Sequence, residues 1–182
     1  MITHVAALRA LNLPINHLAF VVADIEVAVA QWAGLMGAGP FFFFDHMSFE
    51  YCEFNGAPGA LDHSAAFGQC GPIAIELQQL HMTAPTALAA KLAPSGLGGI
   101  GHVGYISQSI EEESARLEAE GFPLFLRAGA GEMEARFHDT SAALGFSIEV
   151  HRRCAFIETF FEALEEEARH WDGMHPLRPW AG

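Results

Sequence analysis

Hydrophobic and polar residues alternate in short runs along the chain, and two of these runs resemble each other. Residues 15–26 read INHLAFVVADIE, and residues 100–111 read IGHVGYISQSIE. An offset of 85 residues aligns a histidine with a histidine and an Ile-Glu pair with an Ile-Glu pair. Each copy predicts a strand of β-branched and aromatic residues, followed by a helix that begins after Asp24 or Ser109. Such a repeat indicates two copies of one supersecondary unit.

The helix in each copy has a predicted start and end. After Asp24, apolar residues recur at helical spacing as far as Met36, and both helices end near a glycine. In the second copy, Ser109 and Glu112 have the spacing of a capping box. A short strand then follows a proline in each copy, PFFFF at 40–44 and PLFLR at 123–127.

The remainder of each half predicts antiparallel strands. FEYCEF (49–54) and LDHSAAF (61–67) flank NGAPGA, which predicts a hairpin between them. A turn at Cys70-Gly71 leads into PIAIELQQL, and in the second half a turn through SAALG joins two further strands. The fold class that we predict is therefore α+β, built from two βαβββ modules.

The repeat also sets the expected domain boundaries. One domain is predicted over 14–152, with module 1 at about 14–80, a linker helix at about 83–93 and module 2 at about 100–152. Residues 153–182 are expected to form an extra C-terminal helix and a tail.

The apolar stripe of this C-terminal helix runs from Ile157 to Trp171. It exceeds what a helix needs to dock on a sheet that two other helices already cover. We therefore predict that a partner copy covers it in a homodimer.

Composition and charge exclude several classes of function. With 51% hydrophobic and 17% charged residues the chain is not disordered, and no apolar run reaches the roughly 18 residues of a membrane-spanning helix. A net charge of −13 argues against binding to nucleic acid or to a membrane surface. The start, MITHVAALRALNLP, lacks the layout of a secretory signal, and three cysteines without a CxxC pair are typical of a reducing cytoplasm.

Four predicted strands carry the same pattern on one face, an ionisable residue two positions from a very small one. The pairs are His17 with Ala19, Glu76 with Ala74, His102 with Gly104, and Glu149 with Ser147. A single inward histidine is more often a satisfied core residue, but a buried carboxylate is costly without compensation. Two histidines and two glutamates that face one another therefore predict one shared divalent ion: zinc, nickel, cobalt, manganese, magnesium or iron.

These residues make the chain resemble the vicinal oxygen chelate superfamily, which includes glyoxalase I, methylmalonyl-CoA epimerase, bleomycin-resistance proteins and extradiol dioxygenases. The matching segments cover most of residues 14–152: INHLAFVVADIEVAVAQW, PIAIELQQL, GIGHVGYISQSIEEESARLEAEG and FHDTSAALGFSIEVHRR. The resemblance implies that the paired modules form a cup-shaped mixed sheet around the metal, in a commonly dimeric protein. The implied ligands are His17, Glu76, His102 and Glu149, a set like that of glyoxalase I. Bleomycin-resistance proteins lack this set, and extradiol dioxygenases bind iron through two histidines and one carboxylate.

The resemblance also implies a reaction, the movement of a proton next to a carbonyl by an isomerase, epimerase or lyase. A small-molecule substrate with adjacent oxygens would chelate the ion, which would stabilise an enediolate while a carboxylate moves the proton. Glu149 is the expected base and Glu76 its expected partner.

Strand register suggests two further catalytic candidates. If Cys70-Gly71 is a two-residue turn, Ala65 lies opposite Glu76, and His63 faces inward with it. If the same register continues across the next hairpin, Glu50 lies near Ala65. In the epimerases that the chain resembles, an additional glutamate of this region takes part in catalysis. A slip of one residue would turn all of these side chains outward.

Two other functions stay open at this stage. The chain could be a small-molecule binding or sequestering protein without turnover, or a ferrous ring-cleaving dioxygenase. Two of the four residues in Phe41–Phe44 are expected to face into the cup, which favours an aromatic or long acyl substrate.

Overall fold

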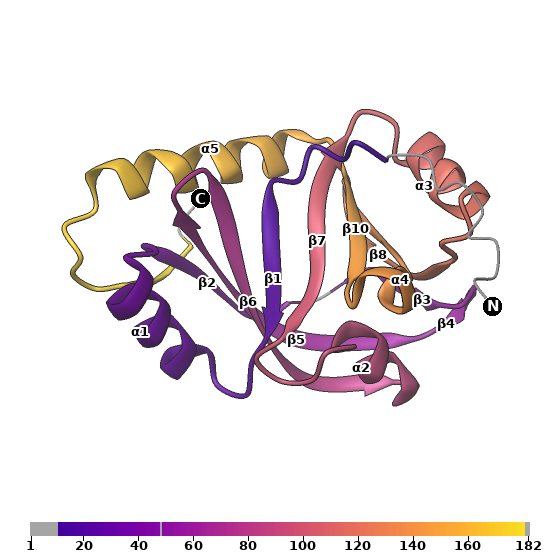
Figure 1. Ribbon diagram of the computed structural model, residues 1–182, viewed down its shortest axis with the longest axis horizontal. Helices are drawn as coiled ribbons and strands as arrows, with labels where there is room; N and C mark the ends of the chain where they lie inside the picture. The colour runs from indigo at the N-terminus through magenta and orange to yellow at the C-terminus, as the bar shows by residue number, and fades with distance from the viewer. Residues whose placement is uncertain (1–10, 48, 181–182) are drawn as a thin grey trace, which may run out of the picture.

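Two modules of the same topology build a mixed sheet of eleven strands (Figure 1). The computed structural model describes residues 11–47 and 49–180, so most of the segment considered for a secretory signal lies outside the described residues. The elements up to the linker are β1 (His17–Val21), α1 (Ile25–Met36), β2 (Phe41–Met47), β3 (Tyr51–Phe54), β4 (Ala57–Pro58), β5 (Ala60–Cys70), β6 (Ile73–Ala84) and α2 (Ala87–Leu92). The elements that follow are β7 (Ile100–Ser107), α3 (Ile110–Ala119), β8 (Leu124–Ala130), β9 (Met133–His138), α4 (Ser141–Leu144), β10 (Ser147–Arg152), α5 (Ala155–His170) and β11 (Leu177–Pro179).

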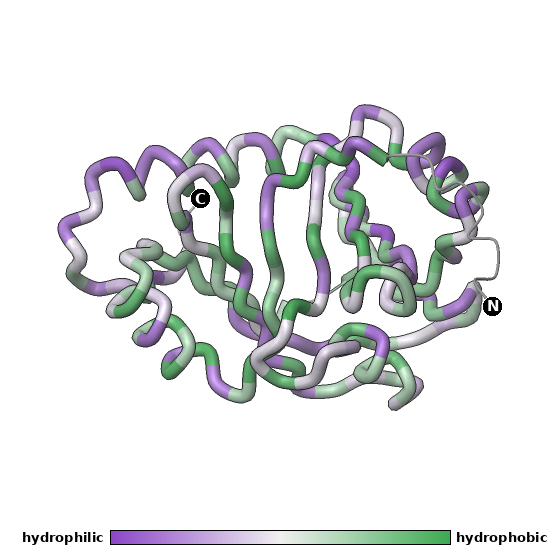
Figure 2. Tube along the Cα trace, in the orientation of Figure 1, coloured by the Kyte–Doolittle hydropathy of each residue, from purple (hydrophilic) through white to green (hydrophobic). Residues whose placement is uncertain are grey.

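The strand order confirms the predicted α+β class and the paired modules. It runs β11-β2-β5-β6-β1-β7-β10-β9-β8-β3-β4. In each module the first strand pairs parallel with the last, β1 with β6 and β7 with β10. The two first strands, β1 and β7, pair antiparallel with each other, so the modules join in the middle of the sheet (Figure 1). Figure 2 shows hydrophilic positions interrupting both of these central strands.

The predicted hairpin between 49–54 and 61–67 is wrong. A tight turn at Asn55-Gly56, with φ angles of 51° and 75°, joins β3 to the short β4 instead. Both edges of β5 are taken by β2 and β6, and β3 extends the open edge of β8 in the other module. The sequence correctly predicted a turn after β3. A turn signal does not show, however, which other strand edge is free to pair with β3.

The structure confirms one of the two predicted N-terminal helix caps and contradicts the other. Asp24 caps α1 through a 2.9 Å hydrogen bond from the Val27 amide, as predicted, and Gly37 ends the helix in a left-handed conformation. The capping box at Ser109 is wrong, because this side chain makes no capping hydrogen bond to α3. The linker helix α2 is shorter than expected, since β6 continues as far as Ala84.

The helix α5 lies over the face of the sheet that carries the four predicted ligands, which we call the inner face. Phe160 and Leu164 of α5 are buried against Phe42 and Phe67, and the outer face of the same strands is covered by α1. Phe42 and Phe44 face inward, which confirms that two of the four phenylalanines line this side. Because the apolar stripe of α5 packs on the sheet of the same chain, it does not require a partner copy to cover it. The homodimer stays a prediction that rests on the family resemblance.

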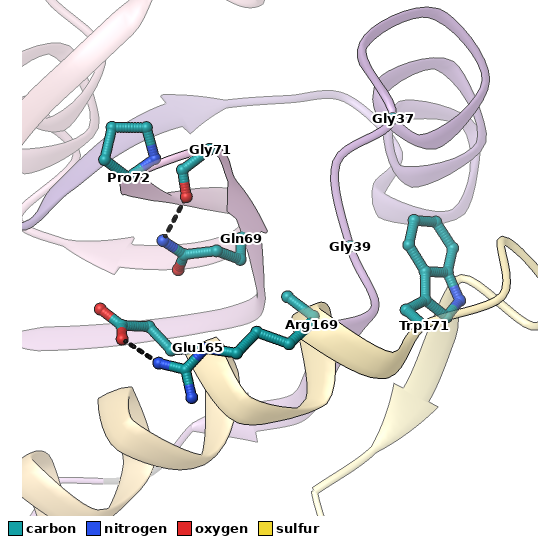
Figure 3. A pocket seen from close by; sticks show the side chains of 9 residues that line it. Gly37, Gly39, Gln69, Gly71, Pro72, Glu165, Arg169 and Trp171 are labelled. Atoms are coloured by element: carbon teal, nitrogen blue, oxygen red, sulfur yellow. Dashed lines mark hydrogen bonds and ion pairs between the residues drawn. The ribbon is translucent and has the colours of Figure 1, made fainter.

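The C-terminal end of α5 is anchored beside α1 (Figure 3). The Trp171 ring lies against the backbone of Gly39, where an added Cβ would come within 2.9 Å of the ring. Beyond α5 the chain returns to the sheet as β11, a strand that the sequence did not predict, and pairs with the edge of β2. This strand covers an edge that would otherwise be open to pairing with another chain. Among the described residues, no helix combines the length and the apolar composition needed to cross a membrane.

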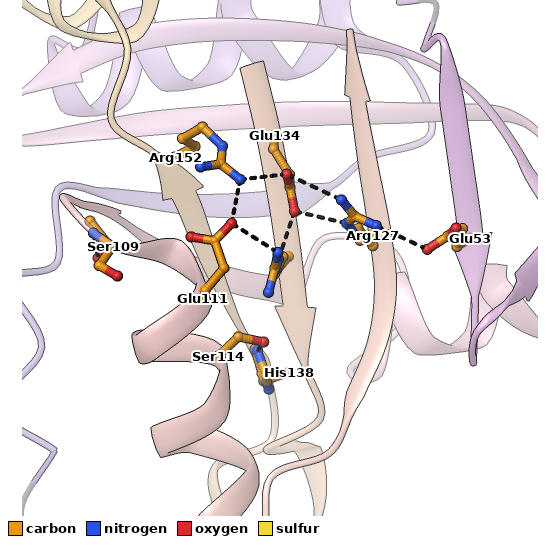
Figure 4. A network of polar contacts seen from close by, with 10 residues as sticks. Glu53, Ser109, Glu111, Ser114, Arg127, Glu134, His138 and Arg152 are labelled. Atoms are coloured by element: carbon orange, nitrogen blue, oxygen red, sulfur yellow. Dashed lines mark hydrogen bonds and ion pairs between the residues drawn. The ribbon is translucent and has the colours of Figure 1, made fainter. Parts of the chain in front are cut away.

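A network of charges lies on the outer face of the second module (Figure 4). The buried Glu134 carboxylate accepts hydrogen bonds from Arg127, Arg136 and Arg152 at distances of 2.7–2.8 Å. Burial alone would raise the pKa of Glu134, but the three guanidinium groups hold that pKa far below its usual range. Arg152 also binds Glu111, so the network ties α3 to β9 and β10.

We predict that Glu134→Gln lowers the free energy of unfolding at pH 7 by about 2 kcal/mol, because three arginines then surround a neutral amide. The folded-state pKa is depressed, so the carboxylate stabilises the fold above about pH 4.3, the ordinary value for glutamate, and this stabilisation is lost as the pH falls further. Urea unfolding of both proteins from pH 7 to pH 2 measures the difference. Glu132→Gln, at an exposed neighbour, is the matched control. A Glu134 variant as stable as this control would contradict the role of the network.

Candidate metal centre

Two rows of residues cross the four central strands where the modules join. In the first row Ala19 lies between Glu76 and His102, and in the second Gly104 lies between His17 and Glu149. Adjacent strands are roughly 4.8 Å apart, so the side chains on either side of a small residue can meet above it. The small residues predicted beside the ligands therefore provide the space in which a histidine and a glutamate come together.

The structure brings together the four predicted ligand residues. Glu149 Oε2 lies 2.9 Å from His17 Nε2 and 3.1 Å from His102 Nε2. Glu76 Oε2 lies 3.2 Å from His102 Nε2 and 3.6 Å from His17 Nε2. One possible ligand atom from each residue lies within 4.8 Å of the others, and all four residues are buried. The expected His, Glu, His, Glu set thus forms one compact cluster.

The charges in this cluster favour a bound cation. Burial alone would lower the pKa of His102, but attraction to Glu149 and hydrogen bonds with Glu149 and Glu76 raise it to about 10. Burial would raise the pKa of Glu149, yet His151 and His102 hold it well below its usual range. Two ionised carboxylates in a buried place require compensating positive charge. Two imidazole nitrogens and two carboxylate oxygens are a donor set that fits a divalent ion such as zinc, nickel, manganese or iron.

Neighbouring polar side chains orient the ligands. Asn16 Oδ1 lies 2.9 Å from His17 Nδ1, so that nitrogen carries the hydrogen and His17 Nε2 presents its lone pair to the cluster. The Gln78 amide donates to Glu76 Oε1 at 2.8 Å, and His151 Nε2 lies 3.1 Å from Glu149 Oε2. Neither Gln78 nor His151 was predicted to take part in the site. The signal was present, because each lies two residues beyond a ligand glutamate and so shares its strand face.

A cavity of about 50 Å³ borders the cluster and is lined by residues of both modules. Its polar lining is Glu76, Gln78, Glu149, His151 and His63, and its apolar lining is Met47, Phe49, Leu61, Phe67, Leu92, Leu126, Ala128, Met133, Ala135 and Phe137. A second, apolar cavity of about 130 Å³ lies under α5. The two cavities share four lining residues, Met47, Phe67, Met133 and His151.

The two additional catalytic candidates have different positions. His63 is buried, stacks on Phe49 and lines the cavity, as the register predicted. Glu50 is exposed and does not line the cavity; its backbone amide binds Gly129 of β8. The expected position of Glu50 near Ala65 is wrong, because β3 pairs with β8.

The register of β5 differs from the expected one by two residues. The turn is Gly71-Pro72 rather than Cys70-Gly71, so Phe67 lies opposite Glu76, and Ala65 lies opposite Gln78. A shift of two residues preserves the face to which each side chain points. For this reason His63 still faces inward although the predicted pairing was wrong.

We predict that Gly104→Ala removes metal binding at the buried cluster. An added Cβ would lie 1.8 Å from His17 Cε1, so the imidazole must leave its position over the Gly104 backbone. Elemental analysis after dialysis against zinc should show about one equivalent less metal per chain than in the wild type. Gly34→Ala is the matched control, because an added Cβ at that helical position meets no atom within 4 Å. A folded Gly104 variant that retains as much zinc as the wild type would contradict the proposed arrangement of His17.

The comparisons with known proteins agree with this architecture. Residues 16–142 match a family model described as the Glyoxalase/Bleomycin resistance protein/Dioxygenase superfamily. A search of curated proteins finds no match. Among solved structures, methylmalonyl-CoA epimerase from Mycobacterium tuberculosis is 17% identical, with a TM-score of 0.52 over 80% of this chain and 91% of that chain. A hypothetical protein from Bacillus halodurans C-125 is 20% identical, with a TM-score of 0.52 over 77% of this chain and 94% of that chain.

At these identities the two solved structures show a shared fold and no more. The family model spans more than two thirds of the sequence, including three of the four clustered ligands, His17, Glu76 and His102. It confirms the resemblance that the four strand patterns suggested. The chain belongs to the glyoxalase/bleomycin resistance protein/dioxygenase superfamily, also called the vicinal oxygen chelate superfamily.

Proposed function

We propose that this protein is a metal-dependent isomerase, epimerase or lyase that moves a proton on a carbon next to a carbonyl. The observation that carries the proposal is the position of two glutamates, Glu76 and Glu149. Each belongs to the buried donor cluster, and each also lines the adjacent cavity. A carboxylate that belongs to a candidate cation site and also lines a cavity is suited to proton transfer beside a polarised oxygen.

The ligands of the ion would be His17, Glu76, His102 and Glu149. When bound, a divalent ion supplies Lewis-acid polarisation of neighbouring substrate oxygens. The other contributions come from the chain itself. Asn16 and Gln78 fix the orientation of one histidine and one glutamate, and the Phe161 ring stacks over His17 at 5.8 Å between ring centroids. This stacking keeps water away from the first-module side of the cluster.

Glu149 is the proposed base and Glu76 its partner. The two carboxylates line the same cavity from β6 and β10, on either side of the central β1–β7 pair, so one can remove a proton and the other can return it. His63 is a third candidate for proton transfer. Burial lowers its pKa, which keeps the imidazole neutral near pH 7, and its buried Nδ1 has no hydrogen-bond partner among the described residues.

The lining of the cavity indicates the class of substrate. Among the described residues that line it, the two glutamates are the acidic side chains, and none is a lysine or an arginine. A carboxylate or phosphate inside would lack a counter-charge, so the portion that enters should be compact, apolar and uncharged except at its chelating oxygens. Liquid water occupies about 30 Å³ per molecule, so about 50 Å³ admits little before side chains move. Met47 and Met133 line both cavities, and methionine side chains adapt readily to such a change.

The decisive experiment is exchange of the α-proton into deuterated water, followed by NMR on the metal-loaded protein. The panel contains uncharged aromatic and aliphatic 1,2-dicarbonyls and 2-hydroxyketones, glutathione hemithioacetals, 2-keto acids and methylmalonyl-CoA, the last suggested by the name of the structural neighbour. Exchange that needs metal supports the proposal. Tight binding without exchange would favour a sequestering protein, and oxygen uptake with ferrous iron would favour a dioxygenase.

We predict that Glu149→Gln abolishes turnover more completely than metal binding. A glutamine carbonyl can replace one of four protein donors in part, but a neutral amide cannot accept the substrate proton. The rate of proton exchange should fall by about 10²–10⁴-fold while metal content at excess zinc stays substantial.

Exchange rates and metal content are measured on the same loaded samples of wild type and variant. Glu26→Gln, at an exposed position on α1, controls for the loss of a carboxylate and should leave both quantities unchanged. If the Glu149 variant exchanges within a few-fold of the wild type, Glu149 is a ligand only. The base would then have to be Glu76 or His63.

A further inference from the structure

A second group of metal-ligand side chains lies away from the buried cluster, on the first module. Asp45 and His46 belong to β2 and His81 to β6, and one possible ligand atom from each lies within 4.8 Å of the others. All three residues are exposed. Between them lies Ser64 of β5, which follows His63 and therefore points to the opposite face of the sheet from the substrate cavity.

An irregularity in β2 makes this arrangement possible. Consecutive residues of a regular strand point to opposite faces, but the pairing of β2 with β5 shifts between Phe44 and Met47. His46 has a φ of 46°, in the left-handed region, and its amide donates to Ser64 Oγ at 3.1 Å. As a result, Asp45 and His46 both approach His81, and the two imidazole rings stack with centroids 4.2 Å apart.

Hydrogen bonds fix which ring nitrogens are available to a metal. His46 Nδ1 lies 2.8 Å from Asp62 Oδ1, so Nδ1 carries the hydrogen and Nε2 carries the lone pair. Ser64 Oγ donates its single hydrogen to Asp45 Oδ1 and lies 2.8 Å from His81 Nε2. His81 Nε2 must therefore donate to Ser64, which leaves the lone pair on His81 Nδ1.

We propose that Asp45, His46 and His81 form a second, surface site for a divalent transition-metal ion such as zinc, nickel or copper. Two imidazoles and one carboxylate suit these ions better than magnesium or calcium, which prefer oxygen ligands. Three protein ligands leave one position open to solvent. The carboxylate of Asp62, bound to His46, supplies the outer contact that commonly supports a metal-binding histidine.

Formation of the site requires only local movement. A tetrahedral ion with bonds of about 2.0–2.2 Å places its donors about 3.3–3.6 Å apart, so ligand atoms within 4.8 Å of one another must close by up to about 1.5 Å. The two stacked imidazole rings must also rotate so that their lone pairs converge on the ion. Exposed side chains make such rotations within nanoseconds. The net charge of −13 also favours the approach of a cation.

The test counts zinc equivalents by calorimetric titration of metal-free protein. The variants are His81→Ala, His46→Ala and Asp62→Asn, with His170→Ala as a control at an exposed histidine of α5. Both histidine variants should bind one equivalent less than wild type, and the control should match wild type. Asp62→Asn should weaken the same equivalent by about 10–100-fold. Circular dichroism confirms that each variant is folded.

The proposal is overturned if folded His81→Ala and His46→Ala bind as many equivalents as wild type with unchanged affinity. This outcome leaves the buried cluster untouched, because its four ligands are intact in every variant of the series. Conversely, His17→Ala should abolish zinc binding at the buried cluster. It should leave unchanged the zinc equivalent at the surface site, which Asp62→Asn weakens. Loss of either site can therefore be recognised without reference to the other.

Discussion

The burial of two carboxylates at the junction of the modules is the constraint on which the rest of the structure depends. Glu76 and Glu149 lie on opposite sides of the β1–β7 pair, and each reaches histidines of both central strands. Such charges are tolerated only with compensating cations and close hydrogen bonds. Ala19 and Gly104 make the approach possible, since a larger side chain in either row would separate the partners. A slip of one residue between β1 and β7 would turn one module's ligands to the outer face, so the cluster fixes the register that joins the modules.

The covering of the inner face breaks the symmetry of the repeat. Over the first module, α5 places Phe160 and Phe161 on Phe67 and His17 and closes that half of the cup. Residues of both modules, and none of α5, line the cavity beside the cluster. Excluding water on one side lowers the local dielectric and strengthens the interactions among the ligands. The cluster is therefore covered by α5 on one side and borders the cavity between the modules on another, where the substrate would enter in the function that we propose.

Much of the centre could be predicted from the sequence because its signals are local. Alternation along a strand places His17, Glu76, His102 and Glu149 on one face, and a small residue two positions away indicates space beside each of them. The positions of β3, β11 and α5 depend instead on which edges and faces remain open after the modules have formed. No local pattern contains that information, so the hairpin at 49–54 was assigned to the wrong partner and Glu50 to the wrong place. His63 was placed on the correct face because its predicted register was wrong by two residues, and such a shift keeps each side chain on the same face.

The two glutamates are equivalent in the repeat but differ in their neighbours, and this difference bears on their chemistry. Gln78 meets Glu76 with an amide nitrogen, which can only donate and therefore holds that carboxylate in one orientation. The corresponding neighbour of Glu149 is His151, whose ring nitrogens can donate or accept according to tautomer. His151 also lines both cavities, so it connects Glu149 to the space under α5. A carboxylate with an adaptable partner can change its hydrogen bonding during a reaction, whereas a carboxylate held by a fixed donor is better suited to remain a ligand. In the reaction that we propose, this asymmetry favours Glu149 over Glu76 as the base.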